Sequence, residues 1–222
     1  MNSLVITKNY DAPPFCEKEV LRYSGCKEAD ENIIELLRVC KIEAWEKLSY
    51  KVCYVELEVA TDGETCDFGI LKIKSRDLSK NLCGCERAIL FSATVGIEID
   101  RLIAKYGRIS PTKALMFQAI GAERIEALCD SFCEDIEKEK NIFLRPRFSP
   151  GYGDLNILVQ KDISAVLNFS KKIGVTLNDS LLLSPSKSVT AFVGIVEGKD
   201  PAPKSKCETC EKKDCMFKEV QK

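Results

Sequence analysis

Apolar residues recur every three or four positions in several stretches of the chain, which is the spacing of an amphipathic helix. The clearest stretch is residues 30–49, whose apolar face consists of Ile33, Leu37, Cys40, Ala44 and Leu48. The same spacing, together with glycine, serine and proline at the expected ends, predicts helices at 17–23, 97–107, 111–138 and 161–172.

Other stretches have the patterns of strands. In residues 51–59, Val55, Leu57 and Val59 alternate with polar positions, which predicts a half-buried strand. Asp62-Gly63 supplies a turn, and residues 66–74 are expected to return as the hairpin partner. Apolar runs predict further strands at 88–94, 181–184 and 189–196. Strands grouped early and late, with helices between them, indicate an α+β fold.

The chain divides by composition into one folded domain and a tail. We expect a single domain at 1–197, with a helical and hairpin part at 1–75 and a main part at 76–197. Residues 198–222 are charged, contain proline and are rich in cysteine, so they are expected to lie outside the core. Neither GxGxxG after a strand nor GxxxxGK[ST] occurs, so the sequence gives no support for a Rossmann or P-loop nucleotide site.

Charge and composition exclude several classes of partner. The 33 basic residues nearly balance the 34 acidic ones, which gives no electrostatic case for nucleic acid or for an anionic membrane. No apolar run approaches the roughly 18 residues of a membrane span, and the N-terminus lacks the pattern of a signal peptide, so a cytoplasmic location is expected. The chain has no histidine, so its chemistry must rest on carboxylates, thiols, backbone groups or a bound cofactor.

The twelve cysteines are expected to be mostly reduced thiols, and three of them have the spacing of metal ligands. Cys207, Cys210 and Cys215 could place three thiolates on zinc or on an iron–sulfur cluster. A fourth ligand could come from Cys83, from Cys85 or from a partner. The alternative is a flexible tail of reduced thiols, and the sequence does not separate zinc from iron–sulfur.

Residues 144–154 (LRPRFSPGYGD) contain four glycine or proline residues and are expected to form a loop. Arg147 offers a planar fork that can hold a carboxylate, Gly151 allows close approach of a ligand to the backbone, and Tyr152 presents a flat face. Spacing alone favours the alternative, a surface turn whose arginine is solvated and whose tyrosine caps the core.

A family resemblance favours a binding site. RFSPGY resembles the RxxxGY signature of the activation domain of cobalamin-dependent methionine synthase. The helix with Glu126, Asp130 and Glu134 resembles the acidic helix before that signature, and residues 173–195 resemble the segment after it. LRYSGCKEAD and LCGCERAILFSATVG are similar to free-standing versions of the domain. The resemblance covers most of residues 77–196 and implies a single C-shaped fold, mainly an antiparallel sheet with flanking helices.

The resemblance also implies a function. Arg147 would hold the carboxylate of S-adenosylmethionine, Glu126 would face its cationic side, Ser149 and Gly151 would line its site, and Tyr152 would face the corrin. The chain would support reductive methylation of cob(II)alamin on a separate corrinoid-binding methionine synthase, with an electron from a donor such as flavodoxin or ferredoxin. Cobalamin must arrive on the partner, because a chain without histidine cannot carry a DxHxxG motif.

The sequence leaves two alternatives and one departure from the family pattern. The chain could be a metal or iron–sulfur redox protein that passes electrons to a corrinoid protein, or a scaffold subunit of a methionine synthase complex. After Gly151-Tyr152, Gly153-Asp154 stands where the fused domain continues with proline and cysteine, so the corrin-facing surface is expected to differ.

Overall fold

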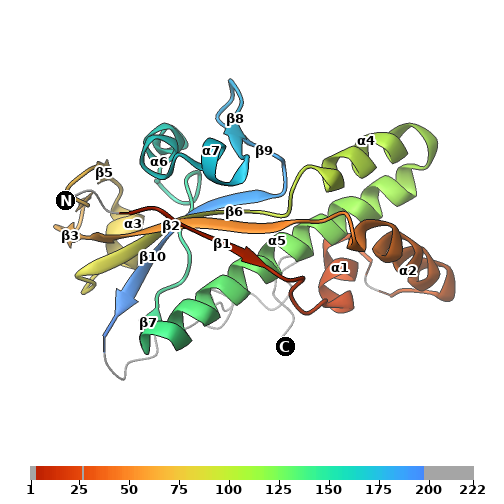
Figure 1. The fold of residues 1–222 in the computed structure, drawn as a ribbon, viewed down its shortest axis with the longest axis horizontal. Coiled ribbons are helices and arrows are strands. Elements are labelled where there is room, and N and C mark those ends of the chain that lie inside the picture. The colour runs from red at the N-terminus through yellow and green to blue at the C-terminus, as the bar shows by residue number, and fades with distance from the viewer. Residues whose placement is uncertain (1–3, 27, 198–222) are drawn as a thin grey trace.

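The computed structural model describes residues 4–26 and 28–197 as an α+β fold around one curled antiparallel sheet (Figure 1). In spatial order the five strands of this sheet are β1 (Ile6–Tyr10), β2 (Tyr50–Glu58), β6 (Arg87–Thr94), β10 (Ser188–Val196) and β7 (Phe143–Leu144). Two small antiparallel sheets consist of β3 (Ala60–Thr61), β4 (Thr65–Asp67) and β5 (Lys72–Lys74), and of β8 (Thr176–Leu177) and β9 (Leu183–Ser184).

Helices cover both faces of the main sheet (Figure 1). They are α1 (Glu17–Tyr23), α2 (Glu31–Trp45), α3 (Arg76–Asn81), α4 (Glu98–Ile109), α5 (Pro111–Lys140), α6 (Val159–Leu167) and α7 (Phe169–Ile173). The long helix α5 lies along one face with α1, α2 and α4, while α6 and α7 lie on the other. None of the helices in the described ranges is long and apolar enough to cross a membrane.

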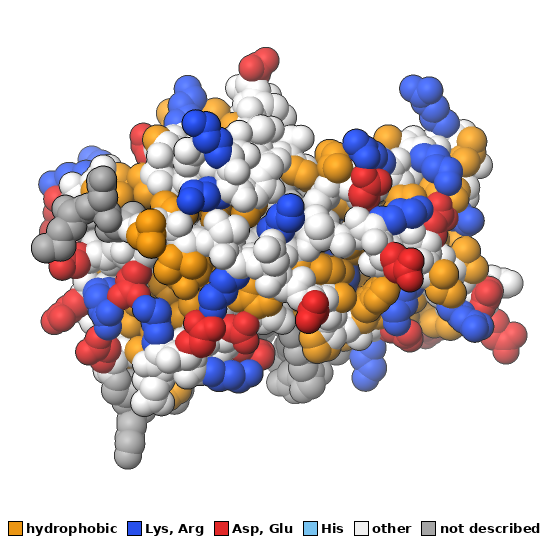
Figure 2. All heavy atoms as spheres, in the orientation of Figure 1, with side chains coloured by type: hydrophobic (Ala, Val, Ile, Leu, Met, Phe, Trp, Pro, Cys, Tyr) orange, Lys and Arg blue, Asp and Glu red, His pale blue; other side chains and the backbone are white. Residues whose placement is uncertain are grey.

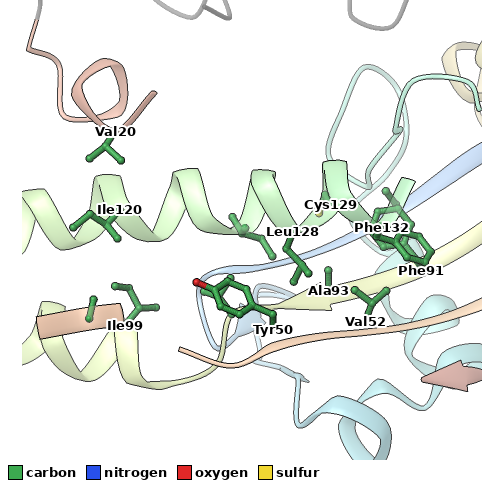
Figure 3. Close-up of a cluster of buried hydrophobic side chains, with 14 of the residues drawn as sticks. Val20, Tyr50, Val52, Phe91, Ala93, Ile99, Ile120, Leu128, Cys129 and Phe132 are labelled. Carbon is green, nitrogen blue, oxygen red and sulfur yellow. The ribbon is translucent and has the colours of Figure 1, made fainter. Parts of the chain in front are cut away.

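Each central strand sends alternate side chains into two separate cores. Val52 and Tyr54 of β2 belong to the core under α5, whereas Cys53 and Val55 belong to the core under α6 and α7. In the first core the ring of Phe132 lies against the rings of Tyr54 of β2 and Phe91 of β6. Figure 3 shows Phe132 beside Phe91. The prediction of a half-buried strand at 51–59 is therefore wrong, because alternation with a residue such as tyrosine also fits a strand covered on both faces.

Three further local predictions are corrected by the structure. Residues 51–59 and 66–74 do not form a hairpin: β2 pairs with β1 and β6, and the turn at Gly63 joins only the short strands β3 and β4. Helix α4 continues past Gly107 to Ile109. The helix expected at 161–172 is two helices, because Asn168 has a φ of 48° and interrupts the hydrogen-bonding pattern.

The two parts of the expected domain contribute to the same sheet. Strand β2 of the first part pairs along its length with β6 of the second, from Lys51 opposite Thr94 to Glu58 opposite Arg87. On the face shown in Figure 2, acidic and basic side chains are interspersed, in keeping with the balanced composition.

A buried ion pair attaches the segment before α1 to α5. Arg124 is fully buried and donates to both carboxylate oxygens of Glu123, at 2.6 and 2.5 Å. It also donates to the carbonyl oxygens of Pro13 and Pro14, at 2.6 and 2.7 Å, while Glu123 accepts from the backbone N–H of Cys16 at 3.0 Å. The charges of α5 thus satisfy backbone groups of a segment more than one hundred residues away in the sequence.

Candidate functional site

The loop that contains Arg147 begins as an extension of the main sheet. Phe148 and Phe192 of β10 exchange two backbone hydrogen bonds of 2.9 Å each, and Arg145 donates its backbone N–H to Gly194 at 2.8 Å. Because neighbouring residues of an extended chain point to opposite faces, Phe148 enters the core under α6 while Arg147 reaches α5. The strand-like pairing therefore determines which side of the sheet receives the guanidinium.

Arg147 is held between two carboxylates of α5. Its Nη1 donates to Asp130 Oδ1 at 2.7 Å, and its Nη2 donates to Glu126 Oε2 at 2.8 Å. Glu126 and Asp130 are four residues apart, so they lie on the same face of the helix. The Arg147 side chain is 26% exposed, against 45% for Glu126 and 35% for Asp130, so the three groups form a cluster at the surface. One guanidinium and two carboxylates give this charged cluster a net charge of −1.

Two cysteines of α5 lie beside the charged cluster and are not activated by it. Burial raises the pKa of Cys129 well above its ordinary value and that of Cys133 to about 11, although Arg147 acts in the opposite direction. Protonated thiols are poor nucleophiles. Both cysteines therefore serve mainly in packing, and Cys129 is fully buried.

Residues 149–152 form a turn that directs Tyr152 outward. Tyr152 donates its backbone N–H to Ser149 O at 3.1 Å, and Gly151, with a φ of 90°, donates to Leu155 O at 2.8 Å. The Tyr152 ring contacts Phe148 edge-on, with 6.4 Å between ring centroids, and 62% of the residue is exposed. The flat ring of Tyr152 is therefore exposed to solvent, next to a turn that is held by backbone hydrogen bonds.

The structure brings together the residues that the sequence singled out for ligand binding. Glu126 and Arg147 are in direct contact, and Ser149, Gly151 and Tyr152 follow Arg147 in the same loop. Asp130, which the sequence marked only as part of an acidic helix, is the second partner of Arg147. Its spacing of four from Glu126 was the available signal. The contacts of these residues with a ligand stay predictions.

The metal site expected in the tail is not tested. Cys207, Cys210 and Cys215 lie outside the described residues. Cys83 is exposed and Cys85 is buried, and the nine cysteines in the described ranges are free thiols. Within residues 4–26 and 28–197, no group of three or more cysteine, aspartate or glutamate side chains is arranged to hold a metal ion.

In chemical terms, the charged cluster can recognise a ligand that carries both signs of charge. A guanidinium binds carboxylates, and carboxylates bind ammonium or other cationic groups. Burial acts to lower the pKa of Arg147, but the facing thiols and carboxylates outweigh it and raise the pKa, so Arg147 is positively charged. The two cysteines nearest to the charged cluster, Cys129 and Cys133, are protonated and therefore poor nucleophiles.

Comparison with known proteins identifies a solved structure with the same fold. No protein-family model matches the chain, and no curated protein sequence matches it. Thirteen chains of solved structures match, among them the crystal structure of the MetH reactivation domain bound to AdoHcy. That structure has a TM-score of 0.62 and 13% sequence identity, and the match covers 87% of this chain and 78% of the other. The predicted α+β fold with a mainly antiparallel sheet is confirmed, and the chain has the fold of the MetH reactivation domain.

Proposed function

We propose that this chain binds S-adenosylmethionine at the charged cluster and the turn at 149–152, and that it supports the reductive methylation of cobalamin on a separate methionine synthase. The observation that carries the proposal is the pairing of Arg147 with Glu126 and Asp130, next to Gly151-Tyr152, in a fold shared with a domain solved with AdoHcy.

The charges of the cluster and of the ligand are complementary. S-adenosylmethionine has a carboxylate, an ammonium and a sulfonium, so its net charge is +1, while the cluster has a net charge of −1. The guanidinium has five N–H donors; Glu126 and Asp130 accept from two of them and the Cys133 thiol also interacts with the guanidinium, so a ligand carboxylate would bind at the donors that remain. The same two carboxylates can then interact with the ligand ammonium.

In the proposed reaction, no side chain of this protein needs to form or break a covalent bond. One-electron reduction of cob(II)alamin gives cob(I)alamin, whose cobalt takes the methyl group of S-adenosylmethionine and releases S-adenosylhomocysteine. The nucleophile belongs to the partner's corrinoid and the leaving group to the ligand, so orientation is the main contribution of the protein. The exposed ring of Tyr152 offers a flat apolar surface on which a corrin could rest. The electron would come from a donor such as flavodoxin or ferredoxin.

Calorimetric titration of the full chain with S-adenosylmethionine tests the proposal. We expect saturable one-to-one binding that Arg147→Gln weakens roughly 10- to 100-fold, because a hydrogen bond between charged groups contributes about 1.5–3 kcal/mol. Arg38→Gln is the matched control, since Arg38 is 73% exposed on α2. Absence of binding by the wild-type chain, or equal binding by Arg147→Gln, would contradict the proposed site.

Reactivation is measured separately, by adding the chain to an oxidised corrinoid-binding methionine synthase with reductant and S-adenosylmethionine. We expect methylcobalamin to form with the wild-type chain and much more slowly with Arg147→Gln. Binding without any effect on the synthase would restrict the function to ligand binding.

A further inference from the structure

The loop after Tyr152 is connected to the start of α3 by an unusual set of contacts. The first amides of a helix have no partner within the helix. Asp154 accepts from two of them, with Arg76 N at 2.8 Å from Oδ2 and Asp77 N at 3.2 Å from Oδ1. It also accepts from the Ser75 hydroxyl at 2.5 Å. A side chain of the loop thus caps a helix almost eighty residues earlier in the sequence.

The connection is reciprocal, and it requires glycine at position 153. The backbone N–H of Asp154 donates to Asp77 Oδ2 at 3.2 Å. Gly153 has a φ of 53°, and a Cβ at this position would lie 2.1 Å from the same Asp77 oxygen. Any larger residue would force Asp77 away from the loop. We call the contacts of Gly153 and Asp154 with residues 75–77 the loop latch.

The loop latch and the sheet hold the candidate binding turn from both sides. On one side Phe148 is paired with Phe192, and on the other Asp154 is bound to α3. Only residues 149–153 lie between these two attachments, so the backbone at Gly151 and Tyr152 has little freedom. A loop that is already ordered loses less conformational entropy when a ligand binds.

The contacts of the exposed residues 151–154 affect the conformation of the loop more than the stability of the whole fold. Gly151, Tyr152, Gly153 and Asp154 are all exposed. Hydrogen bonds at such a position contribute little to the core, so their main effect is on the conformation of the loop itself. This is the place where the chain departs from the family pattern, with Gly-Asp after Gly-Tyr.

We infer that Asp154 is a positioning residue, which holds the turn at Gly151 and Tyr152 in the conformation that receives S-adenosylmethionine without contacting the ligand. The inference rests on the proposed function of the same loop. It assigns a role to the Gly153-Asp154 pair beyond that of a turn, and it makes Ser75 and Asp77 part of the support of the site.

Three variants of the full chain test the inference. Asp154→Ala removes the acceptors of the loop latch, Asp154→Asn keeps one acceptor oxygen, and Gly153→Ala disturbs Asp77 from the other side. Asp179→Asn is the control for the lost charge, because Asp179 is exposed in the turn between β8 and β9. Calorimetry gives the Kd for S-adenosylmethionine, thermal denaturation gives the Tm, and amide hydrogen exchange measures the mobility of residues 148–153.

For Asp154→Ala and Gly153→Ala we expect a Kd about tenfold higher, faster exchange in residues 148–153, and a Tm within a few degrees of wild type. Asp154→Asn should lie between Asp154→Ala and wild type, and Asp179→Asn should match wild type. If exchange in the loop does not change, or if it accelerates while the Kd stays constant, the inference is wrong. Failure of the proposed function looks different, because the wild-type chain then would not bind S-adenosylmethionine.

Discussion

Replacing Arg124 with methionine tests how strongly the buried ion pair holds the segment before α1 on α5. Methionine is apolar and nearly fills the space of the aliphatic part of arginine, so the substitution removes charge and hydrogen bonds with little loss of volume. It leaves the Glu123 carboxylate, which is 3% exposed, with the backbone N–H of Cys16 as its remaining hydrogen bond shown by the structure. The carbonyl groups of Pro13 and Pro14 lose the guanidinium as well.

We expect Arg124→Met to lower the free energy of unfolding by about 3–5 kcal/mol, the usual cost of removing one member of a buried ion pair. The double variant Glu123→Gln with Arg124→Met should recover part of this loss, because no unpaired charge is then buried. It should not recover all of it, since each backbone group left without a partner costs about 1–3 kcal/mol. Arg101→Met is the matched control: Arg101 is 68% exposed and pairs with Glu98, so its loss should cost less than about 1 kcal/mol.

Equilibrium unfolding in urea, followed by circular dichroism, gives the free energy of each variant. A value for Arg124→Met within 1 kcal/mol of wild type would refute the reasoning, because it would mean that the carboxylate of Glu123 is solvated or protonated without cost. A double variant less stable than Arg124→Met would refute the assignment of the loss to an unpaired charge.

Two further predictions concern the cores on the two faces of the sheet. Burial raises the pKa of Cys40 and Cys66 to about 11 and that of Cys53 to about 12, so the folded state favours the neutral thiols; this stabilisation is present below pH 9 and is lost as the pH rises towards 11–12. The free energy of unfolding measured in urea should therefore fall above pH 9, by about 1.4 kcal/mol per pH unit for each thiol, and a flat profile would contradict the burial of these groups. Gly194→Ala should destabilise the fold by about 1–3 kcal/mol in the same assay, because the new methyl group would lie 2.6 Å from Cys85 Sγ; a stable variant would show that the core around β10 yields easily.

The sequence predicted the elements whose signal is local. The amphipathic spacing located α2 and α5, and α1 begins and ends at the predicted residues. Strand β1 was not predicted, because ITKNY has no apolar pattern and forms a strand only by pairing with β2, from Ile6 opposite Tyr54 to Tyr10 opposite Tyr50. The hairpin at 51–74 was predicted wrongly because a local signal, the turn at Gly63, was present but did not decide which strands pair. Its turn is real, but β6, which lies beyond the turn in the sequence, pairs with β2 in its place.

For the candidate site, too, the sequence predicted the local features but not the long-range contacts. The breakers in residues 144–154 predicted a loop, and the resemblance pointed to Arg147 and Glu126. The side of the sheet on which Arg147 lies could not be read from the sequence, because it depends on the pairing of Phe148 with Phe192, forty-four positions later. The loop latch was hidden in the same way, since Asp154 and Ser75 are 79 residues apart.

Charged residues on helices show most clearly why long-range contacts decide the outcome. The charged residues of α5 lie in two different environments. Glu123 and Arg124 are buried because residues 13–16 cover them, whereas Glu126 and Asp130 stay at the surface and meet Arg147. Glu123 and Arg124 therefore serve stability, whereas Glu126 and Asp130, a few residues further along the same helix, belong to the proposed binding site. The difference comes from which distant segment lies over each turn of α5, and a charge pattern within the helix contains no information about that.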